Sequence, residues 1–581
     1  MTKNDINKPT ISEATSRNWA RLHSDGSGRL MSRANKQLST KTILPLEYFS
    51  NKENVADIQR FVTFCKEKNY KVEDVLFSVG VEMLKKAGIY DKPHVAAALS
   101  SWRFPSTLSS LSTLSSSSLL ALPPLPTDEF DLLGLLYQCF LVEGEKNRKG
   151  SYYTPLEVAR NMTKGLDFSK GQTFFDPCCG SGAFLLALDG ASPEQVLGCD
   201  NDPIAVMIAK FNLLLKYPSQ VFDPQIVCCD YLSPKHPKVS KNSKNPKNPS
   251  FIISNPPWGA VIFDEKNNPI STKESFSFFF EKAFNQLEDG GKIRFLLPES
   301  ILNVKCHRNF RKFLLENTDI QSITLYNGSF SGVQTRYIDI ECGRRNSRDA
   351  ARHIPTFDFG SSKVNDVSLK SFRLTNNLNF NLLSDSDLEK VQKILAKKKY
   401  TLKDSIWALG VITGDNKNKV KTKRGRGMEP IYTGKEIEAY TLKQPKKFIK
   451  YKRTDYQQVA KDEIYRADEK LVYKFISKNL VFAYDNSKSL FLNSANILIP
   501  RIPGMSIKTV LAFLNSELFK FLYKSLFGEI KILKGNLLEL PFPAISPEID
   551  KKLTELVNQV LKGNKEAIKE IDEVINGLLL Y

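Results

Sequence analysis

Near the middle of the chain, Asn255, two prolines and Trp258 follow a short apolar run, Phe251-Ile252-Ile253. The prolines cannot continue a sheet ladder and hold the backbone rigid, so a strand should stop there. The side-chain oxygen of Asn255 and the carbonyl of Pro256 can then point at one amino group, while the Trp258 ring offers a flat face to a planar substrate. Two such acceptors free the lone pair of a conjugated amine for attack on a methyl sulfonium. Asn255-Pro256-Pro257-Trp258 therefore indicates methyl transfer to an exocyclic amine, or else only a stiff turn after a buried strand.

A glycine-rich segment lies upstream, directly after another apolar run, Thr173–Asp176. It reads Asp176-Pro177-Cys178-Cys179-Gly180-Ser181-Gly182. Because Gly180 and Gly182 have no side chain, the backbone can approach a ligand closely there, and the next helix is expected to begin with its positive dipole end. A glycine pair between a strand and a helix favours a nucleotide-like ligand.

Two further apolar runs end in acids, Asp200 and Asp230. The carboxyl ends of parallel strands meet at one edge of a sheet, so both acids should lie near Gly180. Asp200 is placed to accept from two ribose hydroxyls, and Asp230 to receive an adenine amino group. Either acid alone could be an ordinary helix cap or loop residue, but their alignment with the glycines favours one nucleoside site.

The stretch Lys149–Glu157 has the pattern of a capping box, with Thr154 as N-cap, Pro155 as first helical residue and Glu157 as reciprocal cap. It predicts a helix start beside Tyr153. Such a start could also help hold the carboxylate of an amino-acid cofactor.

Composition favours a soluble protein with an anionic partner. The chain has 581 residues, a net charge of +20 and a pI near 9.3, which indicates two to four domains and a nucleic acid or a membrane surface as partner. Neither the N-terminus nor the Leu-rich, proline-broken stretch 108–125 reads as a signal peptide or membrane span. The nine cysteines form no Cys-x-x-Cys pair and the five histidines are scattered, so we expect no metal site and a reducing cytoplasm.

The organisation along the chain predicts three parts. Periodic apolar residues over 55–62 and 75–86 indicate a helical region, followed by a Ser/Leu/Pro-rich linker. Strand and helix patterns then alternate, which argues for a doubly wound α/β sheet, before the composition turns Lys-rich. The expected domains are 1–127, 128–370 and 371–581.

In their order, Gly150-Ser151-Tyr152-Tyr153-Thr154-Pro155, the glycine segment and Asn255-Pro256-Pro257-Trp258 resemble the gamma-class N6-adenine DNA methyltransferases of restriction–modification systems. The resemblance covers about 128–345 and implies a Rossmann-like class I S-adenosylmethionine-dependent methyltransferase sheet. It implies that Tyr153, Thr154, Pro155, Asp176, Pro177, Gly180 and Gly182 hold the methionine part of S-adenosylmethionine. It further implies that Asp200 binds the ribose, Asp230 the adenine, Asn255 and Pro256 the target amine, and Trp258 the target base. Asn327–Val333 resembles a late family motif, which makes Phe330 a second candidate for stacking.

The C-terminal part is similar, more loosely, to TaqI-like target recognition domains, through 431–437, 469–473, 514–516 and 541–543. Within it, glycines and cations over 410–426 predict a flexible basic loop for phosphate contacts, or else a solvated charge run. Its cations are Lys417, Lys419, Lys421, Lys423, Arg424 and Arg426. A recognition domain of the α+β class fits an enzyme that flips a duplex base and reads its neighbours.

These features predict a site-specific DNA adenine-N6 methyltransferase that uses S-adenosylmethionine, binds double-stranded DNA and acts beside a separate restriction endonuclease. The alternatives are a cytosine-N4, RNA or protein-glutamine amino-methyltransferase, and a non-catalytic DNA-binding specificity subunit. Pro177-Cys178 and Glu53-Asn54-Val55 resemble cytosine-C5 methylase motifs, but they occur in the wrong order, and Cys178 lies inside the cofactor segment. We therefore reject a cysteine nucleophile, and we find no nuclease motif.

Overall fold

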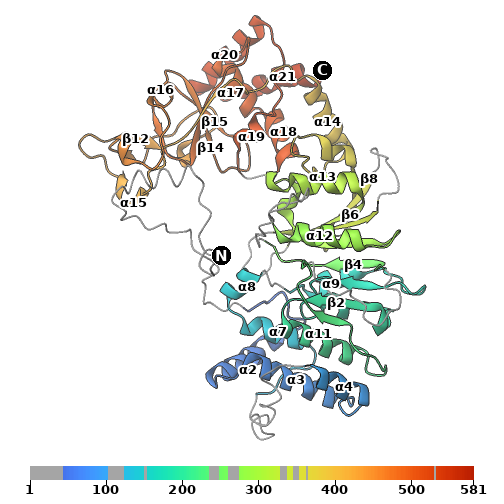
Figure 1. The fold of residues 1–581 in the computed structure, drawn as a ribbon. Coiled ribbons are helices and arrows are strands. Elements are labelled where there is room, and N and C mark those ends of the chain that lie inside the picture. The colour runs from blue at the N-terminus through green and yellow to red at the C-terminus, as the bar shows by residue number, and fades with distance from the viewer. Residues whose placement is uncertain are drawn as a thin grey trace. The chain divides into compact units, whose positions relative to one another are not determined.

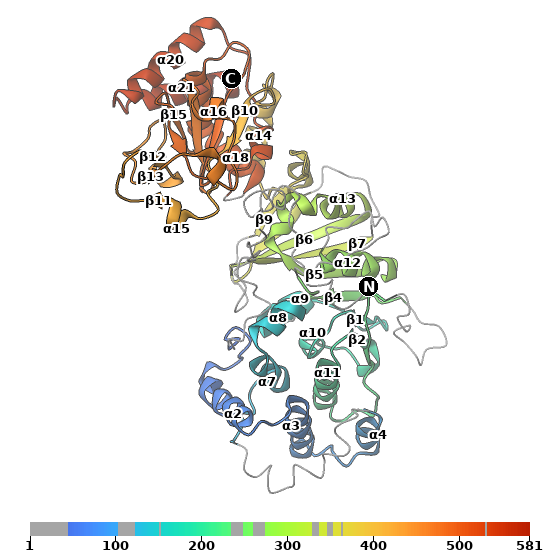
Figure 2. The ribbon, with the colours of Figure 1, turned by 60° about the vertical axis from the view of Figure 1, so that its left-hand side comes forward.

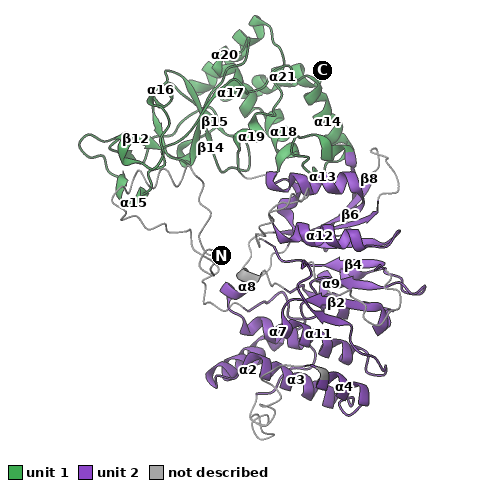
Figure 3. Ribbon diagram, viewed as in Figure 1, with its two compact units in different colours: residues 1–34, 370–581 green, residues 35–369 purple. Residues whose placement is uncertain are grey.

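The computed structural model describes residues 44–102, 123–149, 153–233, 248–258, 274–327, 336–344, 353–361, 364–528 and 531–581. These residues fall into two compact units, one within 35–369 and one within 370–581 (Figure 3). Their helices and strands are labelled in Figures 1 and 2. No helix among the described residues is long and apolar enough to span a bilayer.

The first unit is built on a nine-stranded sheet of order β3-β2-β1-β4-β5-β7-β6-β8-β9. Its strands are β1 (Phe174–Asp176), β2 (Val196–Asp200), β3 (Ile226–Cys228), β4 (Phe251–Ser254), β5 (Lys292–Pro298), β6 (Thr318–Tyr326), β7 (Tyr337–Arg344), β8 (His353–Asp358) and β9 (Val364–Ser368). The strands from β3 to β5 are parallel, and β7 enters antiparallel between β5 and β6. This topology confirms the predicted doubly wound α/β fold, and the predicted apolar runs Thr173–Asp176 and Phe251–Ile253 match β1 and β4 to within one residue.

The central strands are buried because helices cover both faces of the sheet. Every residue of β1 is buried, as are four of the five in β2. Such strands read as continuous apolar runs, which is why the sequence revealed them. From β1 the chain extends the sheet in one direction, to β2 and β3, and from β4 it extends the sheet in the other direction, to β5. Because crossover connections between parallel strands are right-handed, α11 (Pro203–Lys216) and α12 (Ser275–Gln286) lie on opposite faces of the sheet.

The helices before the sheet share its hydrophobic core. They are α2 (Val55–Glu67), α3 (Val72–Lys86), α4 (Pro93–Ser101), α7 (Leu132–Phe140), α8 (Glu143–Lys149) and α9 (Leu156–Thr163). Side chains from α2, α3 and α7 pack in one cluster with those of α11 and β1. In Figures 1 and 2, α3, α7 and α11 lie side by side. The predicted helices over 55–62 and 75–86 are confirmed by α2 and α3.

On the other face, α12 packs through phenylalanines against α13 (Arg308–Asn317) and β5. Phe280 contacts Phe295 of β5 and Phe310 of α13 edge-on, with ring centroids 5.2 Å apart in both pairs. These contacts hold the first turns of α12 rigidly beside the carboxyl ends of the central strands.

The second unit combines two four-stranded sheets with helices. One sheet has the order β10-β17-β14-β15 and the other β11-β13-β12-β16. The strands are β10 (Ile406–Leu409), β11 (Val420–Lys421), β12 (Glu429–Tyr432), β13 (Phe448–Ile449), β14 (Lys470–Lys474), β15 (Phe482–Asp485), β16 (Leu490–Phe491) and β17 (Ala495–Ile499). The helices are α14 (Asp385–Ala396), α15 (Asn416–Lys419), α16 (Asp462–Tyr465), α17 (Ile507–Asn515), α18 (Glu517–Phe527), α19 (Lys534–Leu537), α20 (Pro547–Leu561) and α21 (Ala567–Leu580). This unit has its own cores and an α+β fold, as predicted.

Candidate active site

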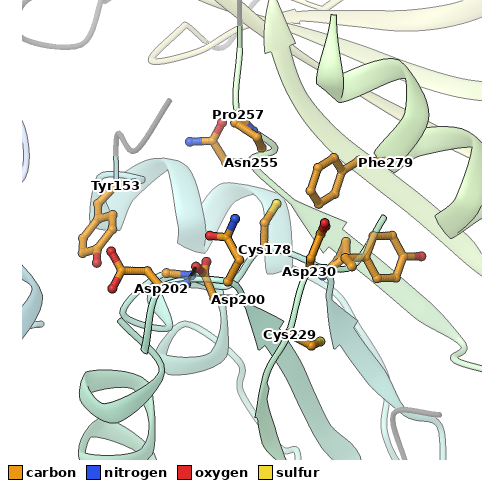
Figure 4. Close-up of a pocket in the computed structure, with 13 residues that line it drawn as sticks. Tyr153, Cys178, Asp200, Asp202, Cys229, Asp230, Asn255, Pro257 and Phe279 are labelled. Atoms are coloured by element: carbon orange, nitrogen blue, oxygen red, sulfur yellow. Dashed lines mark hydrogen bonds between the residues drawn. The ribbon is translucent and has the colours of Figure 1, made fainter. Parts of the chain in front are cut away.

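A pocket opens at the carboxyl ends of β1 to β4, where the strand order reverses between β1 and β4 (Figure 4). Open α/β sheets bind ligands at such a point because the loops diverge there. Its lining comes from the loops after these strands, from the segment before α9 and from α12. The residues are Tyr153, Pro177, Cys178, Gly180, Asp200, Asn201, Asp202, Cys229, Asp230, Tyr231, Asn255, Pro257 and Phe279.

The glycine segment follows β1 directly and turns into the short helix α10 (Ala183–Leu186), with Gly182 as N-cap. Both glycines have positive φ, +53° at Gly180 and +92° at Gly182, a conformation that other residues rarely adopt. A Cβ on Gly180 would lie 3.0 Å from the Tyr153 ring. Glycine at position 180 therefore keeps this wall of the pocket open and lets Tyr153 approach the loop.

The acid at the end of β2 fixes the same loop from the opposite side. One carboxylate oxygen of Asp200 accepts from the Gly180 N–H at 2.9 Å, and the other accepts from the Asp202 N–H at 2.9 Å. Burial raises the pKa of Asp200. Both oxygens are thus already engaged by backbone donors, so a ligand hydroxyl would share them with these N–H groups.

Asp202 is a pocket residue that sequence reasoning missed. One of its oxygens caps α11 by accepting from the Ile204 N–H at 3.0 Å, and the other accepts from the Tyr137 hydroxyl at 2.7 Å. Its place directly after Asp200 and Asn201 was the one signal in the sequence that could have indicated it.

The far end of the pocket combines an acid with two aromatic rings. Asp230 lies two residues beyond the end of β3 and accepts from the Leu232 N–H at 3.0 Å. Tyr231 and Phe279 stack at 5.5 Å with an interplanar angle of 29°. Tyr231 could have been found as the neighbour of Asp230, whereas nothing in the sequence marked Phe279, which α12 brings in from across the sheet.

Asp176 does not line the pocket; it lies buried beneath it. One of its carboxylate oxygens accepts from the Ser254 hydroxyl at 2.6 Å and from the Cys178 N–H at 3.1 Å. Among the described residues, the other oxygen has no hydrogen-bond partner. Asp176 thus ties the glycine segment to the last residue of β4, directly before Asn255.

Burial raises the pKa of Asp176 to about 7 from its usual 3.8. The unfolded chain would lose this proton at a lower pH than the folded chain. The free energy of unfolding should therefore fall as the pH rises from about 4 to about 7, by up to about 1.4 kcal/mol per pH unit. Asp176→Asn resembles the protonated acid and should lose that dependence. We expect urea unfolding midpoints of the cofactor-free protein to fall less from pH 5 to pH 8 in the variant than in the wild type. Equal falls would contradict the assignment.

Asn255 follows β4 and lines the pocket. Its amide nitrogen donates to the Thr154 hydroxyl at 3.3 Å, a bond that fixes which end of the amide is the acceptor. The carbonyl of Pro257 accepts from the Ser275 hydroxyl at the start of α12. The stiff turn is therefore held from two sides, by the segment before α9 and by α12.

Two residues of the predicted catalytic motif, Trp258 and Pro256, do not line the pocket. Pro256 is buried. The indole N–H of Trp258 donates to the Leu296 carbonyl at 3.2 Å, and its ring lies 6.2 Å from that of Tyr337. Phe330 lies outside the described residues, so its stacking role stays a prediction.

The predicted capping box at α9 is wrong. The helix begins at Leu156 with Pro155 as N-cap, and no side chain caps it. Thr154 is buried and its hydroxyl accepts from Asn255 instead, so the threonine serves the pocket rather than the helix. Of the described residues in this segment, only Tyr153 lines the pocket.

Cys178 lines the pocket, and its thiol lies 2.9 Å from the Ser254 hydroxyl. Burial raises its pKa well above its usual value, which disfavours the thiolate. This supports the rejection of a cysteine nucleophile.

Three side chains of types that can ligate a metal lie together outside the pocket lining, because the potential ligand atoms of Glu274, Cys306 and His307 are within 4.8 Å of one another. No spacing pattern in the sequence indicated this group.

In the second unit, the predicted basic loop is partly regular structure. Lys417 and Lys419 lie in α15, and Lys421 lies in β11, which pairs with β13. Lys417, Lys421, Lys423, Arg424 and Arg426 are exposed. Lys419 differs, because its ammonium donates to the carbonyls of Thr413 and Asp455 and lies over the Tyr456 ring. Lys419 therefore anchors the segment rather than offering its charge to solvent.

The fold and the site together define a Rossmann-like methyltransferase joined to an α+β unit. The chain belongs to the N-6 DNA methylase family, the DNA adenine methyltransferases of restriction–modification systems. Residues 128–336 match the N-6 DNA methylase model, and residues 429–542 match the TaqI-like C-terminal specificity domain.

Among curated proteins, the type II methyltransferase M.VspI of Vibrio sp. (strain 343) is 30% identical over 314 residues, which cover 52% of this chain and 74% of the relative. The type I restriction enzyme MjaVIII methylase subunit of Methanocaldococcus jannaschii is 27% identical over 162 residues, 27% of this chain and 28% of that protein. The solved structure of the type IIL restriction–modification enzyme MmeI in complex with DNA covers 90% of this chain with a TM-score of 0.58 at 15% identity, a likeness of fold.

Proposed function

We propose that this chain transfers a methyl group from S-adenosylmethionine to the N6 amine of an adenine flipped out of duplex DNA, as the modification enzyme of a restriction–modification system. The observation that carries the proposal is the position of Asn255 in one pocket with the glycine segment, Asp200 and Asp230. An amine held by Asn255 would therefore face the ligand that Asp200 and Asp230 bind.

The pocket fits the cofactor by the chemistry of its donors and acceptors. Asp200 and Asp202 supply carboxylates where ribose hydroxyls would lie, and Asp230 with Phe279 offers an acceptor beside a ring for the adenine. Gly180 leaves open the space beside the Tyr153 ring that a Cβ would fill, and the glycine segment would hold the methionine part there. When bound there, S-adenosylmethionine supplies an electrophilic methyl group.

The chain's own residues act by orientation. The Asn255 oxygen and the Pro256 carbonyl each accept one N–H of the target amine, which pulls the nitrogen towards tetrahedral geometry. The carbon–nitrogen bond would form as the bond between the methyl carbon and the sulfonium sulfur breaks, with the thioether as leaving group, and the amine would release one proton to solvent. The hydrogen bond to the Thr154 hydroxyl holds the Asn255 amide in one orientation, and the two prolines keep the backbone rigid. Because these groups are already oriented, the activation free energy of methyl transfer includes no cost for reorienting them.

DNA binding is assigned to the second unit through its match to a specificity domain and its exposed cations. We place the enzyme in the cytoplasm, which is supported by the lack of a disulfide at any of its nine cysteines, all of them among the described residues. Cleavage, where it accompanies modification, is assigned to a separate endonuclease.

The test is transfer of isotope-labelled methyl from S-adenosylmethionine to duplex DNA, followed by nuclease digestion and mass spectrometry. We expect N6-methyladenine, and methylation-sensitive sequencing of DNA from expressing cells should show one recurrent site. N4-methylcytosine alone would refute the adenine acceptor, and labelling of RNA or protein in place of DNA would refute the substrate class. Cofactor binding without any transfer would identify a non-catalytic subunit.

A further inference from the structure

Helix α7 is a buried element to which the reaction outlined above assigns no role. All nine of its residues, from Leu132 to Phe140, are buried. Its apolar side chains belong to the core shared by α2, α3 and α11. Among the polar side chains of α7 and its N-cap, Asp131 at the N-cap and Tyr137 in the middle are each bonded to a different loop of the pocket.

Asp131 reaches the glycine segment. The residue is 3% exposed, and one of its oxygens accepts from the Ser181 hydroxyl and from the Tyr48 hydroxyl, the latter at 2.6 Å. The other oxygen accepts at 2.8 Å from the Gly134 N–H and at 2.8 Å from the Asn212 amide, which also donates to the Ser181 carbonyl. Ser181 is therefore held at both its side chain and its backbone.

This network exceeds what a helix cap requires. Capping α7 needs only the bond from the Gly134 N–H, yet three further donors from distant segments converge on the same buried carboxylate. Burying an acid is unfavourable unless its hydrogen bonds are made. A Cβ on Gly134 would lie 2.1 Å from the Asp131 carboxylate and 2.5 Å from the Ser181 hydroxyl, so only glycine permits this close approach.

Tyr137, almost two turns further along α7, reaches the second loop. Its hydroxyl donates to Asp202 at 2.7 Å, and Asp202 lines the pocket beside Asp200. Its ring also lies 6.4 Å from that of Tyr153, another lining residue. One rigid helix thus contacts the loop after β1 through Asp131 and the loop after β2 through Tyr137.

We infer that α7 is a brace of the cofactor site, in which Asp131 and Tyr137 are positioning residues that hold the loops after β1 and β2 at a fixed separation. The inference rests on the proposed function, since it concerns the same pocket. Tyr48 extends the brace to the segment before α2, because its hydroxyl joins Asp131 and its ring packs edge-on against Tyr153 at 5.9 Å.

The test uses two variants of the full chain that remove one hydroxyl each, Ser181→Ala and Tyr137→Phe. Loss of a buried hydrogen bond should loosen one loop and weaken S-adenosylmethionine binding about 5- to 30-fold in titration calorimetry. The KM for the cofactor should rise by the same factor, while kcat at saturating cofactor and DNA affinity should change less than about twofold.

Tyr326→Phe is the matched control. It also removes a tyrosine hydroxyl that donates to an aspartate at 2.7 Å in the first unit, but its partner, Asp339, lies outside the pocket lining. The two Tyr→Phe variants should lower the melting temperature similarly, and only Tyr137→Phe should weaken cofactor binding. Equal cofactor affinities of the Tyr137→Phe and Tyr326→Phe variants would contradict the inference that α7 positions the pocket loops. A wild-type protein that binds no S-adenosylmethionine would instead refute the proposed function itself.

Discussion

Replacing Asn255 with alanine should lower methyl transfer to duplex DNA by about 100- to 1,000-fold, the usual effect of removing one preorganised polar group from a reacting centre. Affinity for S-adenosylmethionine should change less than about threefold, because under the proposed function the glycine segment, Asp200 and Asp230 hold the cofactor and Asn255 does not. Single-turnover transfer and cofactor titration on the same preparation measure the two quantities.

Two companion variants sharpen this result. Thr154→Val keeps Asn255 but removes the hydroxyl that orients its amide, so transfer should fall by about 10-fold, within the range of one lost hydrogen bond. Asn317→Ala truncates an exposed asparagine at the end of α13 and should leave both quantities unchanged. Normal turnover in Asn255→Ala would end the proposed mechanism.

Neutralising the five exposed cations of the basic segment should produce the second large effect. With Lys417, Lys421, Lys423, Arg424 and Arg426 all changed to glutamine, we expect the slope of log K against log[salt] for DNA binding to fall by about 4 to 5, if each contacts a phosphate. Binding at moderate salt should weaken by about 100-fold or more, and methyl transfer should recover at high DNA concentration. Fluorescence anisotropy across a salt series measures the slope.

The same unit supplies the controls. Lys551, Lys552, Lys562, Lys565 and Lys569 are five exposed lysines on or beside α20 and α21, and their change to glutamine removes the same net charge elsewhere. If the basic segment contacts DNA, this second set should leave most of the slope intact. Lys419→Gln should lower the melting temperature rather than the slope, because its ammonium is bonded inward. Equal slopes for both five-residue variants would show that net charge, not this segment, drives binding.

The sequence predicted the sheet well because its central strands are short, largely buried and apolar. The end of β1, the end of β2 and the turn after β4 also met at one pocket, as the parallel arrangement requires. Asp176 shows the limit of such reasoning, since its place in the motif predicted a ligand contact. Its side chain instead joins the motif to Ser254 of β4, a contact across 78 residues of sequence.

The errors and omissions come from partners that are distant along the chain. Thr154 has local neighbours that fit a capping box, but its hydroxyl is taken by Asn255, 101 residues away. Helix α7 reads as an ordinary apolar helix, and nothing local shows that Asp131 meets Ser181. Similarly, Lys419 resembles its charged neighbours until Asp455 comes close to it in the folded unit.

The position of β1, bonded to β2 on one side and β4 on the other, has a consequence for how this enzyme could diverge. The two reactants would approach from loops on adjacent strands, so the distance between them is set by the spacing of about 4.8 Å between paired strands. That spacing belongs to the peptide backbone and does not depend on which side chains read the DNA. A lineage could therefore exchange its recognition unit, and with it the methylated sequence, without rebuilding the chemistry.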